Sequence, residues 1–151
     1  MDEASAGDAF ELINQFLRED PHYLDSSRAY GDEGAGALRR ALELFLARPE
    51  LGFVWLSYDE DGEPVGVCVV CFAVSTSLGA LVAKLDDFYV KSGRQGHGVG
   101  SAHVEGLKGE LRRSAVRRID TSVHLGNDDA RRFYEKHGFN SLGEERLACL
   151  I

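Results

Sequence analysis

The sequence is short of proline, cysteine and positive charge, and it has no long apolar segment. Its 151 residues include 3 Pro and 3 Cys, and 17 Lys and Arg stand against 25 Asp and Glu, for a net charge of −8. The longest apolar run, Val65–Val74, is far shorter than the roughly 20 residues of a membrane helix, so no membrane partner is predicted. An acidic domain binds nucleic acid poorly, because phosphate neutralisation requires clustered Lys and Arg. This charge suits a cationic small molecule instead.

The cysteines and the first residues bear on the compartment. An odd number of cysteines cannot all pair within the chain, which favours a reducing, cytoplasmic setting. Residues 1–5 lack the basic and apolar regions of a signal peptide. Cys68 and Cys71 lie in a strand-like run, with no second pair or neighbouring His to complete a zinc site. They are interpreted as small buried hydrophobes, and no metal is predicted.

Apolar periodicity predicts one α/β domain over residues 1–151, because no linker or repeat divides the chain. Helical spacing predicts a helix over Phe10–Leu17 with Asp8 as its cap and Asp20-Pro21 as its end, a loop over Asp25–Gly36, and a second helix over Leu38–Leu46. Further along, the pattern predicts strands over Phe53–Tyr58, Val65–Val74, Leu81–Val90 and Arg118–Leu125, a helix behind Gly98, a helix over Asp128–His137, and a terminal strand from Phe139.

One segment, Ser92–Gly100, departs from ordinary helix and strand patterns. It carries glycines at 96, 98 and 100 between a predicted strand and a predicted helix. Glycine lets backbone amides approach a ligand, and the amides at a helix N-terminus favour an anion such as a phosphate. The local pattern fits a tight turn without a ligand equally well. No Gly-Lys-Ser/Thr follows, which excludes a Walker loop, and the Gly-x-Gly-x-x-Gly spacing of a dinucleotide fold is absent.

The order Gln95-x-x-Gly98-x-Gly100, after a strand that ends Phe88-Tyr89-Val90, resembles the acetyl-CoA pyrophosphate loop of the GNAT superfamily of N-acetyltransferases. A second signature of that family follows at the expected distance, Asn127-x-x-Ala130-x-x-x-Tyr134-Glu135-Lys136-x-Gly138-Phe139. The resemblance covers residues 85–139. It implies a single GNAT-like domain, with a mixed, mostly antiparallel central sheet flanked by helices. Within the family, Asp86-Asp87 is similar to the Glu-Asp pair of spermidine/spermine (diamine) acetyltransferases. Family members open with a strand before the first helix, for which residues 1–7 leave little room.

The resemblance implies acetyl-CoA as the cosubstrate and assigns its contacts. Backbone groups of Phe88 and Val90 would pair with the pantetheine arm as an added strand does, which is compatible with core packing of their side chains. The implied cofactor-binding residues are Phe88, Tyr89, Val90, Gln95, Gly96, His97, Gly98, Val99, Gly100, Ser101 and Asn127. The His97 side chain is interpreted as solvent-exposed, and Asn127 also fits the N-cap of the last helix.

Three residues are predicted to carry the chemistry. By resemblance, Tyr134 holds the place of the general acid that protonates the CoA thiolate, and helix packing is the competing interpretation. Asp86 and Asp87 are neighbours on a strand and therefore point to opposite faces, so one of them lines a given cleft. The diamine enzymes favour Asp86 for holding the ammonium and accepting its proton through water; pairing with Lys84 is the alternative. His124 fits either a base or a hydrogen-bonded sheet histidine.

These residues together predict transfer of an acetyl group from acetyl-CoA to a primary amine by direct attack, with a small cationic, diamine-like acceptor. An aminoglycoside, an amino acid and a protein amine stay open as acceptors. A function of another class also stays open: a non-catalytic acyl-CoA-binding module, with which the missing first strand is compatible. Tyr134 counts against that module, because a pure binder needs no proton donor at the sulfur. The resemblance, with the apolar end Leu147–Ile151, predicts a homodimer.

Overall fold

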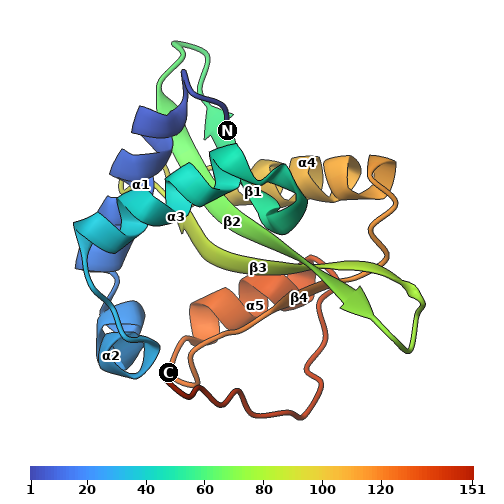
Figure 1. Ribbon diagram of the computed structural model, residues 1–151. Coiled ribbons are helices and arrows are strands. Elements are labelled where there is room, and N and C mark those ends of the chain that lie inside the picture. The colour runs from blue at the N-terminus through green and yellow to red at the C-terminus, as the bar shows by residue number, and fades with distance from the viewer.

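Five α-helices and a four-stranded sheet make up the computed structural model, which describes residues 1–151 (Figure 1). The helices are α1 (Ala6–Glu19), α2 (Pro21–Tyr30), α3 (Ala35–Ala47), α4 (Val99–Arg113) and α5 (Asp128–Lys136). The strands β1 (Gly52–Tyr58), β2 (Pro64–Ser75), β3 (Ala80–Val90) and β4 (Ile119–Thr121) lie side by side in that order. The pairs β1–β2 and β2–β3 are antiparallel and β4 is parallel to β3, which confirms the predicted mixed sheet.

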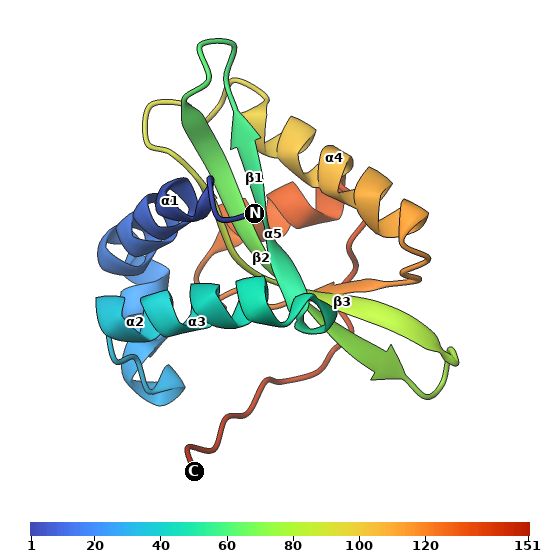
Figure 2. The ribbon, with the colours of Figure 1, turned by 45° about the horizontal axis from the view of Figure 1, so that its top comes forward.

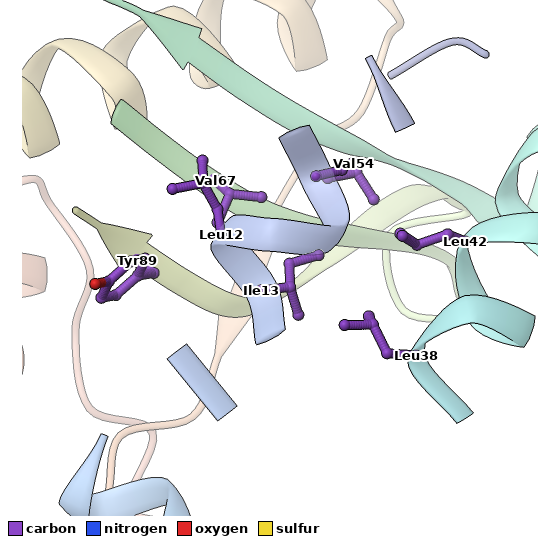
Figure 3. Close-up of a cluster of buried hydrophobic side chains, with 8 residues drawn as sticks. Leu12, Ile13, Leu38, Leu42, Val54, Val67 and Tyr89 are labelled. Atoms are coloured by element: carbon purple, nitrogen blue, oxygen red, sulfur yellow. The ribbon is translucent and has the colours of Figure 1, made fainter. Parts of the chain in front are cut away.

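Helices cover both faces of the sheet, and each face has its own apolar core. Figure 2 shows α1 and α3 separated from α4 by the strands. The core under α1 and α3 contains Leu12, Ile13, Leu38, Leu42, Val54, Val67 and Tyr89 (Figure 3). The core under α4 and α5 contains Cys68, Val70, Leu85, Leu107, Leu111 and Tyr134. Because successive residues of a strand face opposite sides, β2 has to be apolar at nearly every position to serve both cores.

The end of β3 departs from regular pairing, and this opens the sheet. Val69 pairs with Asp86 and Val67 pairs with Tyr89, so β3 has one residue more than β2 between these pairs. Asp87 lies in this bulge, with a φ of 49° in the left-handed region. The pairing of β3 with β4 ends at Leu85. The edge of β3 beyond Leu85 therefore meets no strand on its β4 side, and it leads directly into the glycine loop.

The prediction of a loop from Asp25 to Gly36 is wrong, because α2 continues to Tyr30. The Asp20 carboxylate accepts a hydrogen bond from the Tyr23 amide at 2.7 Å and caps α2. Proline at the first position of a helix loses no hydrogen bond there. The Asp20-Pro21 pair thus ends one helix and starts the next.

Three further boundaries differ from the prediction. The helix α1 begins at Ala6 rather than after Asp8, whose carboxylate accepts a hydrogen bond from the Tyr58 hydroxyl at 2.8 Å. The strand expected over Arg118–Leu125 is reduced to β4, because β3 offers it no partner beyond Leu85. No strand follows Phe139 either: residues 139–151 contain no helix or strand.

The structure also places the first residues, two of the cysteines and the apolar C-terminal end. Residues 1–5 form no strand, and the Met1 amino group touches the edge of β1 through a 2.8 Å hydrogen bond to the Val54 carbonyl. Cys68 is buried, as predicted, and Cys71 is partly buried. None of the helices has both the length and the apolar character that crossing a membrane demands. The homodimer stays a prediction; in the single chain Leu147 and Leu150 are exposed.

Candidate active site

The glycine loop joins β3 to α4 and leaves the first turn of α4 without a cap. Gly98 is the N-cap, and no side chain bonds the amides of this turn. Gly96 and Gly98 have φ values of 78° and 84°, and a Cβ added at either would meet no atom within 4 Å. The Gln95 side-chain amide donates to the Val90 carbonyl at 2.9 Å and ties the loop to β3. Open backbone beside uncapped amides can accept an anion, and these residues are compatible with the pyrophosphate of acetyl-CoA.

The last residues of β3 divide between the two cores. Tyr89 is buried under α1, whereas Phe88 packs on the other face, with ring centroids 6.0 Å from Tyr134 and 5.2 Å from His103. The side chains of Phe88 and Val90 are thus packed inward, while their backbone edge has no strand partner toward β4. Such an edge can pair with an extended ligand, as the strand-like role of the pantetheine arm requires.

Tyr134 lies on α5 at the open end of the sheet and is 8% exposed. Burial raises the pKa of its phenol, and the Asp86 charge raises it further, while the Thr121 hydroxyl acts in the opposite direction. The phenol therefore keeps its proton throughout the neutral range. Its ring packs against Phe133 and Phe139, with centroids 5.4 Å and 5.1 Å away, so the packing interpretation of this tyrosine holds as well.

The two carboxylates of β3 have different surroundings. Asp86 forms an ion pair with Lys84 at 2.6 Å, and the Arg146 guanidinium lies 3.8 Å away, so the ion-pair interpretation holds for Asp86. Burial, with a further contribution from the Asp86 charge, raises the pKa of Asp87 to about 6. The bulge at Asp87 interrupts the strict alternation on which the expectation of opposite faces depends. Because Asp86 raises the pKa of both Asp87 and Tyr134, its charge lies within electrostatic range of both.

The helix α2 brings the Tyr23 side chain within electrostatic range of Asp87. Burial, followed by the charges of Asp32 and Asp87, raises the pKa of Tyr23 to about 12. His124 lies in the loop after β4 rather than in a strand, and its Nε2 is 3.0 Å from the Asp25 carboxylate. No sequence signal marks Tyr23 as a neighbour of Asp87, because Tyr23 lies between the predicted helix end at Asp20-Pro21 and the predicted loop over Asp25–Gly36.

The two ends of α5 also contact the candidate site. The Asn127 side chain accepts a hydrogen bond from the Ala130 amide at 2.9 Å, which confirms the predicted N-cap. At the other end, His137 Nε2 lies 3.0 Å from the Ser101 hydroxyl and Nδ1 lies 3.1 Å from a Glu105 oxygen. These partners are 36 and 32 residues away from His137, so only the packing of α5 on α4 reveals them.

Other buried polar groups and hollows lie away from these residues. His103 bridges the Ser57 hydroxyl at 2.6 Å and the Cys68 sulfur at 3.3 Å, and burial lowers its pKa to about 4, so this imidazole is neutral and structural. Cavities of about 470 Å³ and 230 Å³ both include Tyr58 in their linings, and neither contains Tyr134 or the β3 carboxylates.

The sequence profile of the acetyltransferase (GNAT) family matches residues 11–139. The chain belongs to this family. No protein with a curated description matches it. Among solved structures, a putative acetyltransferase from Arthrobacter sp. shares 29% identity with a TM-score of 0.73, over 100% of this chain and 92% of its own. An integron cassette protein from the mobile metagenome of Cole Harbour Salt Marsh shares 24% identity with a TM-score of 0.78, over 98% and 86%. Glucosamine-6-phosphate N-acetyltransferase from Arabidopsis thaliana shares 16% identity with a TM-score of 0.70, over 99% and 95%. The similarity to the last two structures, at 24% and 16% identity, is evidence of a shared fold alone.

Gly98→Ala is expected to weaken CoA binding by about tenfold or more, because the added methyl group stands where the backbone meets the ligand. Gly62→Ala is the matched control. Gly62 has a φ of 82°, and a Cβ there also meets nothing within 4 Å, so both variants carry the same backbone strain. Calorimetric titration with CoA distinguishes them. Equal affinities in the two variants would show that the glycine loop does not hold the ligand.

Proposed function

We propose that this GNAT-family acetyltransferase transfers the acetyl group of acetyl-CoA to a primary amine of a small cationic, diamine-like molecule by direct attack of the amine. The observation that carries the proposal is the partly buried Asp87 carboxylate, which lies at the bulge where β3 leaves β4 and whose pKa is raised by burial to about 6. A base with this pKa is ionised at neutral pH and still has affinity for a proton.

Each group of the chain has a defined task in this reaction. Acetyl-CoA supplies an acetyl thioester when bound. The uncapped first turn of α4 and the glycine loop hold negative charge. The Asp87 carboxylate accepts, directly or through water, the proton that an ammonium must lose before its nitrogen can attack. Tyr134 holds on its hydroxyl oxygen the proton that the departing thiolate needs, and its raised pKa keeps that proton in place beforehand.

The charge and the aromatic rings around the carboxylates support a cationic acceptor. The chain has a net charge of −8, and α2 brings Tyr23 within electrostatic range of Asp87. The Arg146 guanidinium lies 5.2 Å from the ring centroid of Tyr30 and 3.8 Å from Asp86, so this region already accommodates a positive group of the chain itself. Carboxylates and aromatic faces together favour an ammonium group.

A calorimetric titration with CoA, followed by an acceptor screen, tests the proposal. We expect saturable binding at one site per chain, and thiol release that is fastest with diamines compared with an aminoglycoside, an amino acid and a peptide amine. Faster turnover of one of the other acceptors would replace the diamine-like class. Binding without turnover of any amine would favour the acyl-CoA-binding module. Failure to bind CoA would contradict both.

A further inference from the structure

Three hydrogen-bonded side chains join the first turn of α4 to the end of α5. The Ser101 hydroxyl lies 3.0 Å from Nε2 of His137, and Nδ1 of the same ring lies 3.1 Å from a Glu105 oxygen. The His137 side chain is 8% exposed. Ser101 is the third residue of α4, so it belongs to the turn whose uncapped amides form the anion site.

The partners of His137 determine where its protons lie. Hydrogen bonds from Lys108 and His137 lower the pKa of Glu105, so Glu105 is an ionised acceptor at neutral pH. Nδ1 must therefore carry a proton and donate it to Glu105. In the neutral ring Nε2 is then an acceptor, and Ser101 has to donate its single hydroxyl proton to Nε2. In this state Ser101 has no proton to offer a ligand.

Protonation of the ring reverses the bond to Ser101. Both nitrogens of an imidazolium donate, so Nε2 donates to the Ser101 oxygen and the hydroxyl proton becomes free. We propose that His137 is a positioning residue for the diphosphate: it takes up a proton when a diphosphate binds at the start of α4, and Ser101 then donates its hydroxyl proton to a diphosphate oxygen. This inference rests on the proposed use of acetyl-CoA and adds a control of its binding by pH. By linkage, affinity falls as the pH rises, by at most about tenfold per pH unit.

The groups packed around His137 are compatible with both states of the ring. From α4, the Glu105 carboxylate favours a positive ring, and the Lys108 ammonium, which donates to Glu105 and to the His137 carbonyl, opposes it. From α5, the Phe133 ring lies 4.7 Å away, centroid to centroid. A bound diphosphate adds negative charge on the Ser101 side and shifts this balance toward the imidazolium.

The test measures proton uptake when dephospho-CoA binds, by calorimetric titration in buffers of different ionisation enthalpy from about pH 6 to about pH 8.5, the range in which imidazole titrates. Dephospho-CoA is the probe because its diphosphate diester keeps one charge state in this range, whereas the phosphomonoester of CoA titrates. We expect uptake of up to one proton and an affinity that decreases with rising pH. Binding without uptake would overturn this inference and leave the proposed function standing. No binding of dephospho-CoA or of CoA would contradict both.

Two variants separate the proton exchange from a purely structural role. His137→Gln should abolish the uptake and remove the pH dependence. Glu105→Gln is the sharper variant, because an amide can donate to Nδ1 and lets the neutral ring carry its proton on Nε2. At every pH in this range, the affinity of Glu105→Gln for dephospho-CoA should stay near the value that the wild type shows at low pH. A structural role would instead weaken binding in both variants at every pH. Uptake that persists in His137→Gln, or that disappears in the His22→Gln control, would also overturn the assignment.

Discussion

Tyr134→Phe is expected to lower kcat by about 100-fold to 1000-fold, the usual contribution of a general acid. The variant loses only the phenolic oxygen, while the ring keeps its contacts with Phe88, Phe133 and Phe139. Because burial raises the pKa of this phenol, the wild-type hydroxyl is fully protonated at neutral pH and its loss removes one proton donor. The affinity for CoA should stay within about twofold of the wild-type value, since the anion site lies on α4.

Steady-state kinetics with the best acceptor, together with a CoA titration, measures both effects. Tyr58→Phe is the control, because it also removes a phenol hydroxyl. That hydroxyl donates to the Asp8 carboxylate of α1, and α1 covers the face of the sheet opposite to Tyr134. Wild-type kcat in Tyr134→Phe would remove the general-acid role and leave this tyrosine as a packing residue. A parallel loss of CoA affinity would place its effect in binding rather than in proton transfer.

Local signals account for the parts of the site that the sequence predicted. The glycine loop is visible because left-handed φ values at Gly96 and Gly98 require glycine, and the N-cap at Asn127 is visible because few side chains cap a helix. The buried strand β2 is visible because both of its faces are apolar. In each case the residue type itself reports the local conformation.

The parts that the sequence did not predict depend on register and packing. The bulge at Asp87 exists because β3 has one residue more than β2 between the pairs Val67–Tyr89 and Val69–Asp86, and two adjacent aspartates in a strand pattern do not report that count. The second half of α2 falls in the predicted loop over Asp25–Gly36, since the start of α2 coincides with the signal that ends α1. The contact of His137 with Ser101 arises from two helices far apart in the chain. Such features need the spatial pairing of segments, which periodicity does not contain.

Asp87→Asn is expected to lower kcat/KM by about 100-fold at neutral pH, because an amide cannot accept the ammonium proton. In the wild type, kcat/KM should rise with pH through about 6, the pKa of Asp87, and this limb should disappear in the variant. Asn is the suitable replacement, since it tolerates the φ of 49° better than most residues. Unchanged kcat/KM across the pH range would exclude Asp87 as the proton acceptor.

The same substitution is expected to stabilise the fold at neutral pH. The folded state raises the pKa of Asp87 from 3.8 to about 6, so the folded chain binds this proton more tightly than the unfolded chain. The contribution of Asp87 to stability is therefore most favourable below the unfolded pKa and is lost as the pH rises through the folded pKa. Above it, the ionised carboxylate destabilises the wild type by about 1 to 3 kcal/mol. Denaturant unfolding should show Asp87→Asn more stable by this amount near neutral pH, and equal to the wild type in acid.

Asp86→Asn distinguishes the two carboxylates. Because the Asp86 charge raises the pKa of Asp87, its removal should lower that pKa and shift the acid limb of kcat/KM below about pH 6, while the limb itself persists. If Asp86 were the proton acceptor instead, its substitution would abolish the limb and Asp87→Asn would only displace it. The pair of profiles thus assigns the proton to one carboxylate. The gain in stability of Asp87→Asn reports the free energy that the folded chain gives up to keep a charged base in a partly buried position.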